Sequence, residues 1–426
     1  MVLTAGLTYA QQTKPLSIED AVKLALENST EIKISDSNVR TAESELNVIK
    51  NNQYPDFNIS GQYMYLTNAN IDLKLATGQD TAGEESGGGT PDVNQLMFGM
   101  ATVQMPIFSG FSISNSIKAG KSNYEAEVLN AKNEKENIAL MTINGYINLY
   151  KATKTIELLN ENLKSAHQRV VDFTNMENNG LLAKNDRLKA ELQEANFEIA
   201  LEEAKKNKHI INYQLVTFLK LPEGTTIETT ENTFGIAENN PDVQTSRYDI
   251  QAMEMQLKAA ESQVKVAKGK YYPSIFFSGG YIAADVQNVV AINNAVNVGV
   301  GISYNIADIF KAKSDIKVAK SRASSLAYAI EQANDNVKIQ IENAEQNYQL
   351  ALKKLNVYTK SVEQAVENYR IVKDKYDNGL VDTNDLLEAD VQQLQTKLDL
   401  EIAKADITKA YYELLNAQGQ LTAKLN

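Results

Sequence analysis

The chain has 426 residues and a formal net charge of −12, which argues against a nucleic acid as its partner. It contains no cysteine, which excludes disulfides, thiolate nucleophiles and cysteine-ligated metals. Its mean hydropathy is −0.35, and no apolar run reaches the ~18 residues that a membrane-spanning helix needs.

The first ten residues are mostly apolar and end in the small residue Ala10, which two glutamines follow. This pattern is typical of the second half of a secretory signal, without its basic front. We therefore expect an exported protein in which residues 1–14 are a residual signal segment. A disordered cytoplasmic start is the alternative.

Two helices are predicted next, and local signals mark their ends. Ser17 is placed to cap the first helix, with Asp20 in the position where a capping box has Glu or Gln. The second helix is expected to end at about Gln53, because the residue before Pro55 avoids the α region.

Two strand pairs are predicted, over about residues 57–107 and 274–306, from apolar residues that alternate with polar ones. A run of about ten such residues is long enough for a tilted strand to cross a bilayer. An ordinary half-buried sheet is the alternative, and we consider it weaker because each pair is expected to stand alone between long helices. The alternation is clearest in the last strand, at Val296, Val298, Val300, Ile302, Tyr304 and Ile306.

A polar, glycine-rich segment at residues 77–91 joins the first strand pair. We expect an exposed loop here. No helix starts directly after its glycines, which disfavours a phosphate-binding loop and an enzyme built around it.

A very long helix follows each strand pair, over about residues 111–176 and 310–376. Apolar or small residues recur every seven positions in both, a spacing that predicts a left-handed coiled coil. A helix of ~65 residues is roughly 100 Å long. Each helix is expected to turn at a glycine, Gly180 or Gly379, and to return antiparallel through about 35 residues.

The sequence is internally duplicated. Tyr54-Pro55 recurs as Tyr272-Pro273, and Asn179-Gly180-Leu181 recurs as Asn378-Gly379-Leu380. At a shift of 199, 8 of the 15 residues at 179–193 are identical, where roughly one is expected by chance. We therefore assign a first repeat to residues 15–220, a linker to residues 221–240 and a second repeat to residues 241–426.

Four strands per chain are too few to close a barrel, and an open strand edge cannot face lipid because its N–H and C=O groups would be unsatisfied. The chain must therefore associate. Three copies supply twelve strands, within the range of outer-membrane barrels. The predicted fold class is α+β: duplicated long helical hairpins form a coiled-coil α-barrel, and four strands per chain contribute to a trimeric 12-stranded membrane β-barrel.

The side chains of the strands fit such a barrel. Aromatic residues at the helix end of the strands, Phe108, Phe111, Tyr304 and Phe310, could supply an aromatic girdle. Polar residues suit a water-filled lumen: Asn58, Ser60, Gln62, Asn297, Ser303 and Asn305.

An ordered set of motifs resembles the TolC-like outer-membrane efflux family from about residue 15 onward. The set comprises the paired halves, the strand starts Tyr54-Pro-Asp-Phe57 and Tyr272-Pro-Ser-Ile275, the strand end Met105-Pro-Ile-Phe-Ser-Gly-Phe111, and the two Asn-Gly-Leu tips. The resemblance implies a homotrimeric channel in the outer membrane of a Gram-negative bacterium, surrounded by outer-membrane lipid and extending into the periplasm. It also implies a periplasmic adaptor and an inner-membrane transporter as partners, in a tripartite efflux or type I secretion system that exports small molecules or proteins.

The resemblance assigns adaptor contact to the two hairpin tips. These are Gly180, Leu181 and Leu182 in the first repeat, and Gly379, Leu380 and Val381 in the second. The alternative is a helix that ends at a glycine and is followed by leucines that only pack.

The resemblance also implies a periplasmic gate. Asp385 and Glu388 share one helix face and would form an acidic constriction of six carboxylates in a trimer. Tyr376 and Asp186 match a gate lock of the family. Val381 stands where the family often has an arginine, so the lock is expected to be incomplete. A solvated helix face is the alternative for the acids.

No residue pattern indicates catalysis, a cofactor or a metal. His167 and His209 lie far apart in sequence, with no partner spacing for zinc. No Ser/His/Asp set or paired acid stands out. We therefore expect no enzymatic activity, and a soluble periplasmic coiled-coil scaffold is the main alternative function.

Overall fold

A computed structural model of the protein describes residues 13–67, 93–230, 247–288 and 290–425. Most of the predicted N-terminal segment, the whole glycine-rich loop and part of the predicted linker lie outside these ranges. Among the described helices, none has both the length and the apolar character that crossing a membrane requires.

The chain folds into two compact units, each built from both halves of the sequence. The first unit comprises residues 1–39, 127–253 and 329–426, and the second comprises residues 40–126 and 254–328. The predicted repeats therefore describe the order of elements along the chain, while the compact units cut across them. The exact repeat boundaries stay a prediction.

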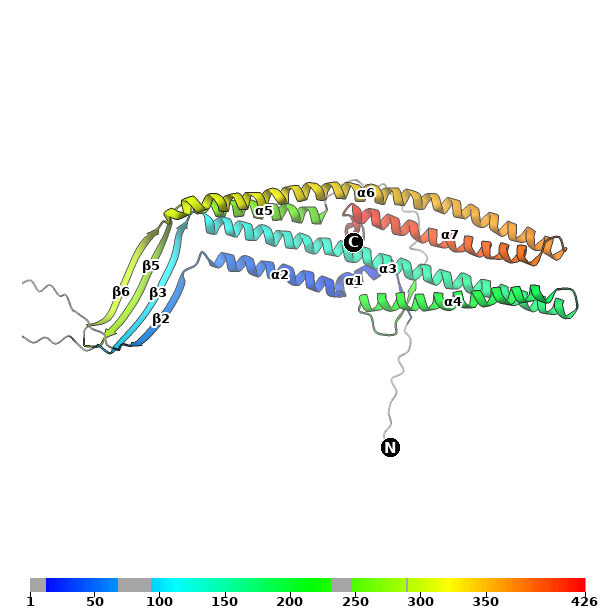
Figure 1. Ribbon diagram of the computed structural model, residues 1–426, viewed down its shortest axis with the longest axis horizontal. Coiled ribbons are helices and arrows are strands. Elements are labelled where there is room, and N and C mark those ends of the chain that lie inside the picture. Colours follow the sequence, from blue (N-terminus) through cyan, green and yellow to red (C-terminus); the bar gives the residue numbers. More distant parts are fainter. Residues whose placement is uncertain (1–12, 68–92, 231–246, 289, 426) are drawn as a thin grey trace, which may run out of the picture. The chain divides into compact units, whose positions relative to one another are not determined.

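The second unit contains one antiparallel sheet in the order β2-β3-β5-β6 (Figure 1). Its strands are β2 (Asp56–Tyr65), β3 (Gln95–Ser109), β5 (Ser274–Val286) and β6 (Val290–Ser303). The expectation that each strand pair stands alone was wrong, because β3 pairs with β5 and joins the two pairs. Within the described residues, β2 and β6 are edges that pair on one side only.

Both edge strands carry exposed apolar side chains in the predicted alternation. Ile59 of β2 is 86% exposed, and Val298 of β6 is 71% exposed. No other described part of the chain covers these side chains, although burying an apolar side chain of this size stabilises a fold by about 1.5–3 kcal/mol. The two edge strands therefore expose apolar side chains at positions where a soluble protein would have buried or polar side chains.

The last strand ends earlier than the sequence indicates. It was expected to continue through Ile306, but β6 ends at Ser303 and α6 (Ile306–Asp377) begins at Ile306. The reason is the side chain of Asn305, which accepts a hydrogen bond from the backbone N–H of Ala307 at 3.1 Å. This is the contact that a helix N-terminus requires, so Asn305 starts a helix and is not a strand residue facing a lumen.

A close backbone approach fixes the junction between β3 and the helix that follows it. Gly110 has φ +60°, and a Cβ there would come within 2.3 Å of the carbonyl oxygen of Gly269. Only glycine fits this position. The rings of Phe108, Phe111 and Tyr272 pack edge to face around the turn, with centroids 5.1 to 6.4 Å apart. Three aromatic rings thus gather where strands become helices.

Four helices form two hairpins, as the sequence predicts. The first hairpin is α3 (Ser112–Asn178) with α4 (Lys184–Phe218), and the second is α6 with α7 (Thr383–Ala417). In the first unit, the two arms of each hairpin lie side by side (Figure 1). Residues of the seven-residue series, including Ile138, Leu159 and Phe173, are buried there. The return helices each have the expected 35 residues.

Shorter helices accompany the hairpins. Ser17 caps α1 (Ile18–Asn28) by accepting from the N–H of Asp20, as predicted. The helix α2 (Thr30–Asn51) ends just before Tyr54-Pro55, and α5 (Tyr248–Gly269) ends just before Tyr272-Pro273. The recurrence of a helix, a strand pair and a long hairpin confirms the internally duplicated α+β fold class.

A small parallel sheet in the first unit was not predicted. β1 (Thr13–Leu16) pairs with β4 (Thr226–Thr229). The buried hydroxyl of Tyr146 donates to the carbonyl of Leu16 at 2.6 Å and accepts from the N–H of Thr230 at 2.9 Å. This side chain fixes the sheet to α3.

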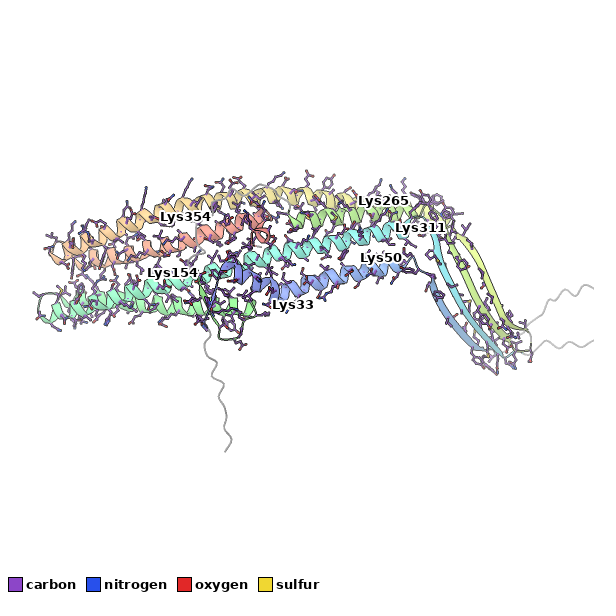
Figure 2. The ribbon with its side chains drawn as sticks, turned by 180° about the vertical axis from the view of Figure 1, so that it is seen from behind. Lys33, Lys50, Lys154, Lys265, Lys311 and Lys354 are labelled. Carbon is purple, nitrogen blue, oxygen red and sulfur yellow. The ribbon has the colours of Figure 1, made fainter. Side chains whose placement is uncertain are left out.

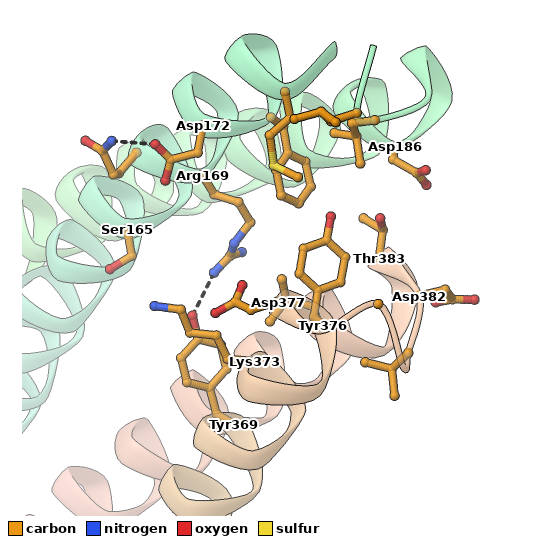
Figure 3. Close-up of a pocket in the computed structure, with 18 residues that line it drawn as sticks. Ser165, Arg169, Asp172, Asp186, Tyr369, Lys373, Tyr376, Asp377, Asp382 and Thr383 are labelled. Atoms are coloured by element: carbon orange, nitrogen blue, oxygen red, sulfur yellow. Dashed lines mark hydrogen bonds between the residues drawn. The ribbon is translucent and has the colours of Figure 1, made fainter. Parts of the chain in front are cut away.

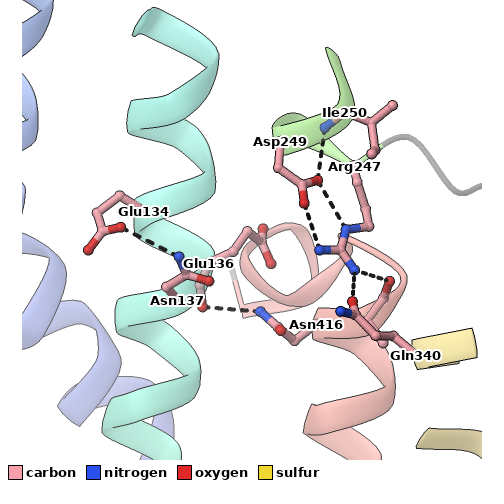
Figure 4. Close-up of polar contacts among 9 residues, drawn as sticks. Glu134, Glu136, Asn137, Arg247, Asp249, Ile250, Gln340 and Asn416 are labelled. Carbon is pink, nitrogen blue, oxygen red and sulfur yellow. Dashed lines mark hydrogen bonds and ion pairs between the residues drawn. The ribbon is translucent and has the colours of Figure 1, made fainter. Parts of the chain in front are cut away.

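Two charged side chains, those of Arg247 and Glu136, fix the start of α5 and the C-terminal segment; Figure 4 shows the contacts of Arg247. Arg247 donates to Asp249 at 2.7 Å, to Gln340 at 2.6 Å and to the carbonyl of Ala417 at 3.4 Å. Glu136 is 3% exposed and accepts from the N–H groups of residues 421 and 422, at the start of α8 (Leu421–Leu425). The C-terminal segment is therefore fixed to α3.

Candidate functional site at the hairpin tips

The two hairpin tips have the same backbone geometry. Gly180 has φ +73° and Gly379 has φ +68°, values that favour glycine. In each tip the glycine N–H bonds three residues back, and the next residue's N–H bonds five residues back, at 2.8 to 2.9 Å. This is the Schellman pattern that ends a helix at glycine. The prediction that both helices turn at these glycines is confirmed.

The leucine after each glycine projects into solvent. Leu181 and Leu380 are both 74% exposed, whereas the corresponding residue of a Schellman motif commonly packs against its own helix. Leu182 and Val381 line a cavity between the hairpins, and Leu181 also borders it. Each tip therefore presents one unpacked leucine, the same in both repeats.

The cavity has a volume of about 890 Å³ and is bordered by all four hairpin helices or their tips (Figure 3). Its wall is apolar at Phe173, Met176 and Leu386, and charged at Arg169 and Lys373. Further acidic residues border it: Asp172, Asp186, Asp377 and Asp382. The lining of the cavity thus combines apolar and charged side chains.

Tyr376 and Asp186 border this same cavity, but they are not joined to each other. The ring of Tyr376 stacks on Phe173, with centroids 5.7 Å apart. Its hydroxyl is buried and has no hydrogen-bond partner among the described residues. Asp186 pairs instead with Lys189 at 3.3 Å. Both residues of the predicted lock therefore border one cavity, and no hydrogen bond joins them within the chain.

Asp385 and Glu388 lie on the exposed face of α7. Asp385 also has a local structural role, because its carboxylate accepts from the N–H of Asp382 at 3.3 Å while the Asp382 carboxylate accepts from the N–H of Asp385 at 3.1 Å. This reciprocal capping box fixes the start of α7. Their expected role in a gate stays a prediction, because it concerns contacts between chains.

A buried charged network above the tips was missed from the sequence. Arg169 on α3 donates to Asp390 on α7 at 2.9 Å and to the hydroxyl of Tyr369 on α6 at 3.3 Å. Gln193 on α4 donates to the same Asp390 oxygen at 3.4 Å and accepts from Arg169 at 3.3 Å. One polar network thus joins all four hairpin helices.

The charge of Arg169 is stable in this setting. Burial acts to lower the pKa of its guanidinium, but the hydrogen bond to Asp390 and the charge of that carboxylate outweigh burial. The pKa therefore lies above its usual value. Arg169 and Asp390 are only 8% and 3% exposed, so each is the main compensation for the buried charge of the other.

No metal centre is apparent in the described residues, where no group of three or more His, Asp or Glu side chains converges on one point. His167 is exposed and pairs with Glu194 at 2.7 Å.

Comparisons with known proteins agree with this geometry. The outer membrane efflux protein family matches residues 21–219 and 241–420. No individually curated protein matches the sequence significantly. The fold is similar to that of VceC, an outer membrane protein of Vibrio cholerae, with a TM-score of 0.81, 16% identity, and coverage of 94% of this chain and 96% of that one.

Two further channels of similar fold are MtrE and OprN. The open state of the Neisseria gonorrhoeae MtrE outer membrane channel gives a TM-score of 0.76 at 19% identity, covering 95% of this chain and 89% of that one. The outer-membrane channel OprN gives 0.79 at 16% identity, covering 94% and 89%.

Long helical hairpins joined to a small apolar sheet define a channel protomer of the TolC-like fold. The chain belongs to the outer membrane efflux protein family. Its members are channels and not enzymes, so the resemblance inferred from the tip and strand motifs is confirmed, and so is the expected class of non-enzymatic efflux channel.

Proposed function

We propose that three copies of this chain form a 12-stranded β-barrel in the outer membrane of a Gram-negative bacterium, with the hairpins forming a helical tube that extends into the periplasm. The observation that carries this proposal is the sheet with two free edges. β2 and β6 run in opposite directions, so β6 of one copy can pair antiparallel with β2 of the next. In a closed ring, the backbone N–H and C=O groups of every strand edge are hydrogen-bonded, as the hydrocarbon region of a membrane requires.

The exposed side chains support insertion into lipid. Phe57, Ile59, Val296, Val298, Val300 and Ile302 are each at least 66% exposed in the single chain. Their strand neighbours Asn58, Ser60, Gln62, Asn297 and Ser303 point to the opposite face, as alternation along a strand demands. One face suits lipid and the other suits a water-filled lumen.

The tips supply the second part of the proposal. We infer that the exposed leucines Leu181 and Leu380, together with the cavity between the hairpins, contact a periplasmic adaptor that connects the channel to an inner-membrane transporter. Exposed apolar side chains are unfavourable in water, and a partner that covers them removes this free-energy cost. The complex would act in tripartite efflux or type I secretion and export small molecules or proteins.

Disulfide trapping tests the barrel directly, because the natural chain has no cysteine. Ser60→Cys in β2 is combined in turn with Asn297→Cys, Gly299→Cys, Gly301→Cys or Ser303→Cys in β6, all on the predicted lumen face. We expect one or two neighbouring positions to give a covalent ladder up to a trimer after oxidation. Ser60→Cys with Val298→Cys, on the opposite face, is the matched control.

The main alternative function predicts another outcome. A soluble periplasmic scaffold would be extracted without detergent, would give no ladder with any pair, and would form no pore in a planar bilayer. That combination would overturn the proposal.

A further inference from the structure

The helix segments of the second unit carry a positive charge that the rest of the chain does not. Residues 40–53, 112–126, 254–273 and 306–328 contain 13 lysines and arginines against 7 aspartates and glutamates, a net charge of +6. The whole chain has a net charge of −12, so the remainder carries −18. Basic residues are therefore concentrated at one end of the helices, beside the sheet.

Five of these lysines form what we call the basic collar: Lys118, Lys265, Lys268, Lys311 and Lys313. All five are exposed, and none forms an ion pair with a described residue. Their neighbours Lys121 and Lys270, by contrast, are already paired with Glu125 and Asp315. Figure 2 shows Lys265 and Lys311 on the helices where these approach the strands.

The collar lies close to the points where strands become helices. Lys265 and Lys268 are in the last turns of α5, which ends at Gly269. Lys311 and Lys313 follow the start of α6 at Ile306, and Lys118 follows the start of α3 at Ser112. At 1.5 Å per residue, each lies within about 11 Å of the end of its helix.

Exposed aromatic residues occupy the zone between the collar and the apolar strands. They are Tyr54, Phe111, Tyr272, Tyr304 and Phe310, each 45 to 79% exposed. Passing from sheet to helices, the surface is first apolar, then aromatic, then basic. This is the order of hydrocarbon, interface and phosphate headgroups across one leaflet of a bilayer. The long stems of the lysines can also extend toward the headgroups.

We propose that the basic collar binds the phosphate groups of anionic phospholipids in the leaflet that faces the helices. The proposal depends on the proposed insertion of the sheet, and it adds a specific lipid partner to it. A lysine near an anionic membrane surface contributes about a fivefold increase in affinity, and the effect acts over about one Debye length. Lysines without a carboxylate partner among the described residues can act in this way.

Spin-labelled lipids provide the test. The full chain is reconstituted in phosphatidylcholine vesicles with a trace of spin-labelled phosphatidylglycerol or phosphatidylcholine, and the protein-bound fraction of each label is measured by electron paramagnetic resonance. We expect phosphatidylglycerol to be preferred by at least about twofold, and the preference to approach one at about 0.5 M salt, where the Debye length is much shorter. Inorganic phosphate at constant ionic strength should not compete, because the ligand is a lipid.

A quadruple variant and a matched control assign the effect to the collar. Replacing Lys265, Lys268, Lys311 and Lys313 by Gln should abolish the preference. Replacing Lys206, Lys353, Lys354 and Lys360 by Gln makes the same charge change at exposed positions of the first unit, and should leave the preference intact. Equal loss in both variants would overturn the proposal, and so would wild-type protein that shows no preference at low salt.

Conductance of the same vesicles separates this proposal from the proposed function. Pores without a phosphatidylglycerol preference would contradict the collar alone. Protein that neither inserts nor conducts would contradict the proposed membrane channel.

Discussion

Arg169 on α3 and Asp390 on α7 form an ion pair with 2.9 Å between Nη1 and Oδ2, and it connects the two hairpins of one chain. The pair is nearly closed to water, so neither charge has an adequate substitute partner in solvent. Gln193 and Tyr369 add contacts from the other two hairpin helices. All four hairpin helices therefore meet in one polar network within a single chain.

Breaking this pair should destabilise the hairpins strongly. We expect Asp390→Asn or Arg169→Met to lower the free energy of unfolding by about 3–5 kcal/mol, because each leaves an uncompensated buried charge. The double variant Arg169→Met with Asp390→Leu should cost much less than the sum of the single changes, because both charges are gone. Thermal unfolding followed by circular dichroism measures these differences.

An ion pair that is exposed to solvent provides the control. Lys338 and Asp335 are 3.0 Å apart but 76% and 64% exposed, so Lys338→Gln should change stability by less than about 0.5 kcal/mol. If Asp390→Asn were equally mild, the buried pair would not be a main connection between the hairpins.

Local sequence signals account for much of the fold. Each of these signals depends only on residues close together in the sequence. The seven-residue series predicted the hairpins, glycines 180 and 379 predicted their turns, and the Tyr-Pro pairs predicted helix ends. Contacts between segments were not accessible in this way. Arg169 and Asp390 are 221 residues apart, and their counterparts at a shift of 199 are Asn368 and Glu191, so the duplication itself gave no indication of the pair.

Two strand pairings were also not predicted from the sequence. β1 and β4 have four residues each, too few for an alternation to be recognised. The pairing of β3 with β5 depends on which strands meet, which alternation within a strand does not specify. At the predicted gate, the sequence indicated which acids share a helix face, but not that the carboxylate of Asp385 also caps its own helix.

The acids on α7 allow a test of the proposed gate. We expect Asp385→Asn with Glu388→Gln to raise the resting single-channel conductance in planar bilayers and to weaken block by multivalent cations, because a ring of carboxylates attracts such ions. Asparagine keeps an oxygen that can accept from the N–H of Asp382, so the change removes charge without removing the cap.

The matched control for the gate is Asp335→Asn, an exposed carboxylate on α6 far from the tips in sequence. It should leave conductance and cation block unchanged. Unaltered block in the Asp385/Glu388 double variant would show that these acids line no constriction.

The exposed tip leucines should matter for export and not for stability. Leu181→Gln with Leu380→Gln is expected to change the free energy of unfolding by less than about 0.5 kcal/mol, since both side chains are already in water. The same variant should lose drug resistance in cells at normal channel abundance. Ile34→Gln replaces a similarly exposed apolar residue away from the tips and should be neutral in both measurements. Full resistance with both leucines replaced would count against adaptor docking here.

Tyr412 on α7 should make the first unit sensitive to alkaline pH. Burial, with a smaller effect of Glu19 and Tyr411, raises the pKa of its hydroxyl from 10.0 to about 12. Between these values the tyrosine of the unfolded chain loses its proton while the folded one keeps it, so rising pH favours the unfolded state. We expect about 2 kcal/mol of the free energy of unfolding to be lost over this range, and none of it below pH 10.

Phenylalanine at this position isolates the contribution. Tyr412→Phe has no proton to lose, so its unfolding midpoint should fall less steeply than that of the natural chain between pH 10 and 12. Tyr213→Phe is the matched control at a residue that is 59% exposed, and its pH profile should follow that of the natural chain. Identical slopes for Tyr412→Phe and the natural chain would mean that the buried hydroxyl ionises as readily in the folded helix as in the unfolded chain.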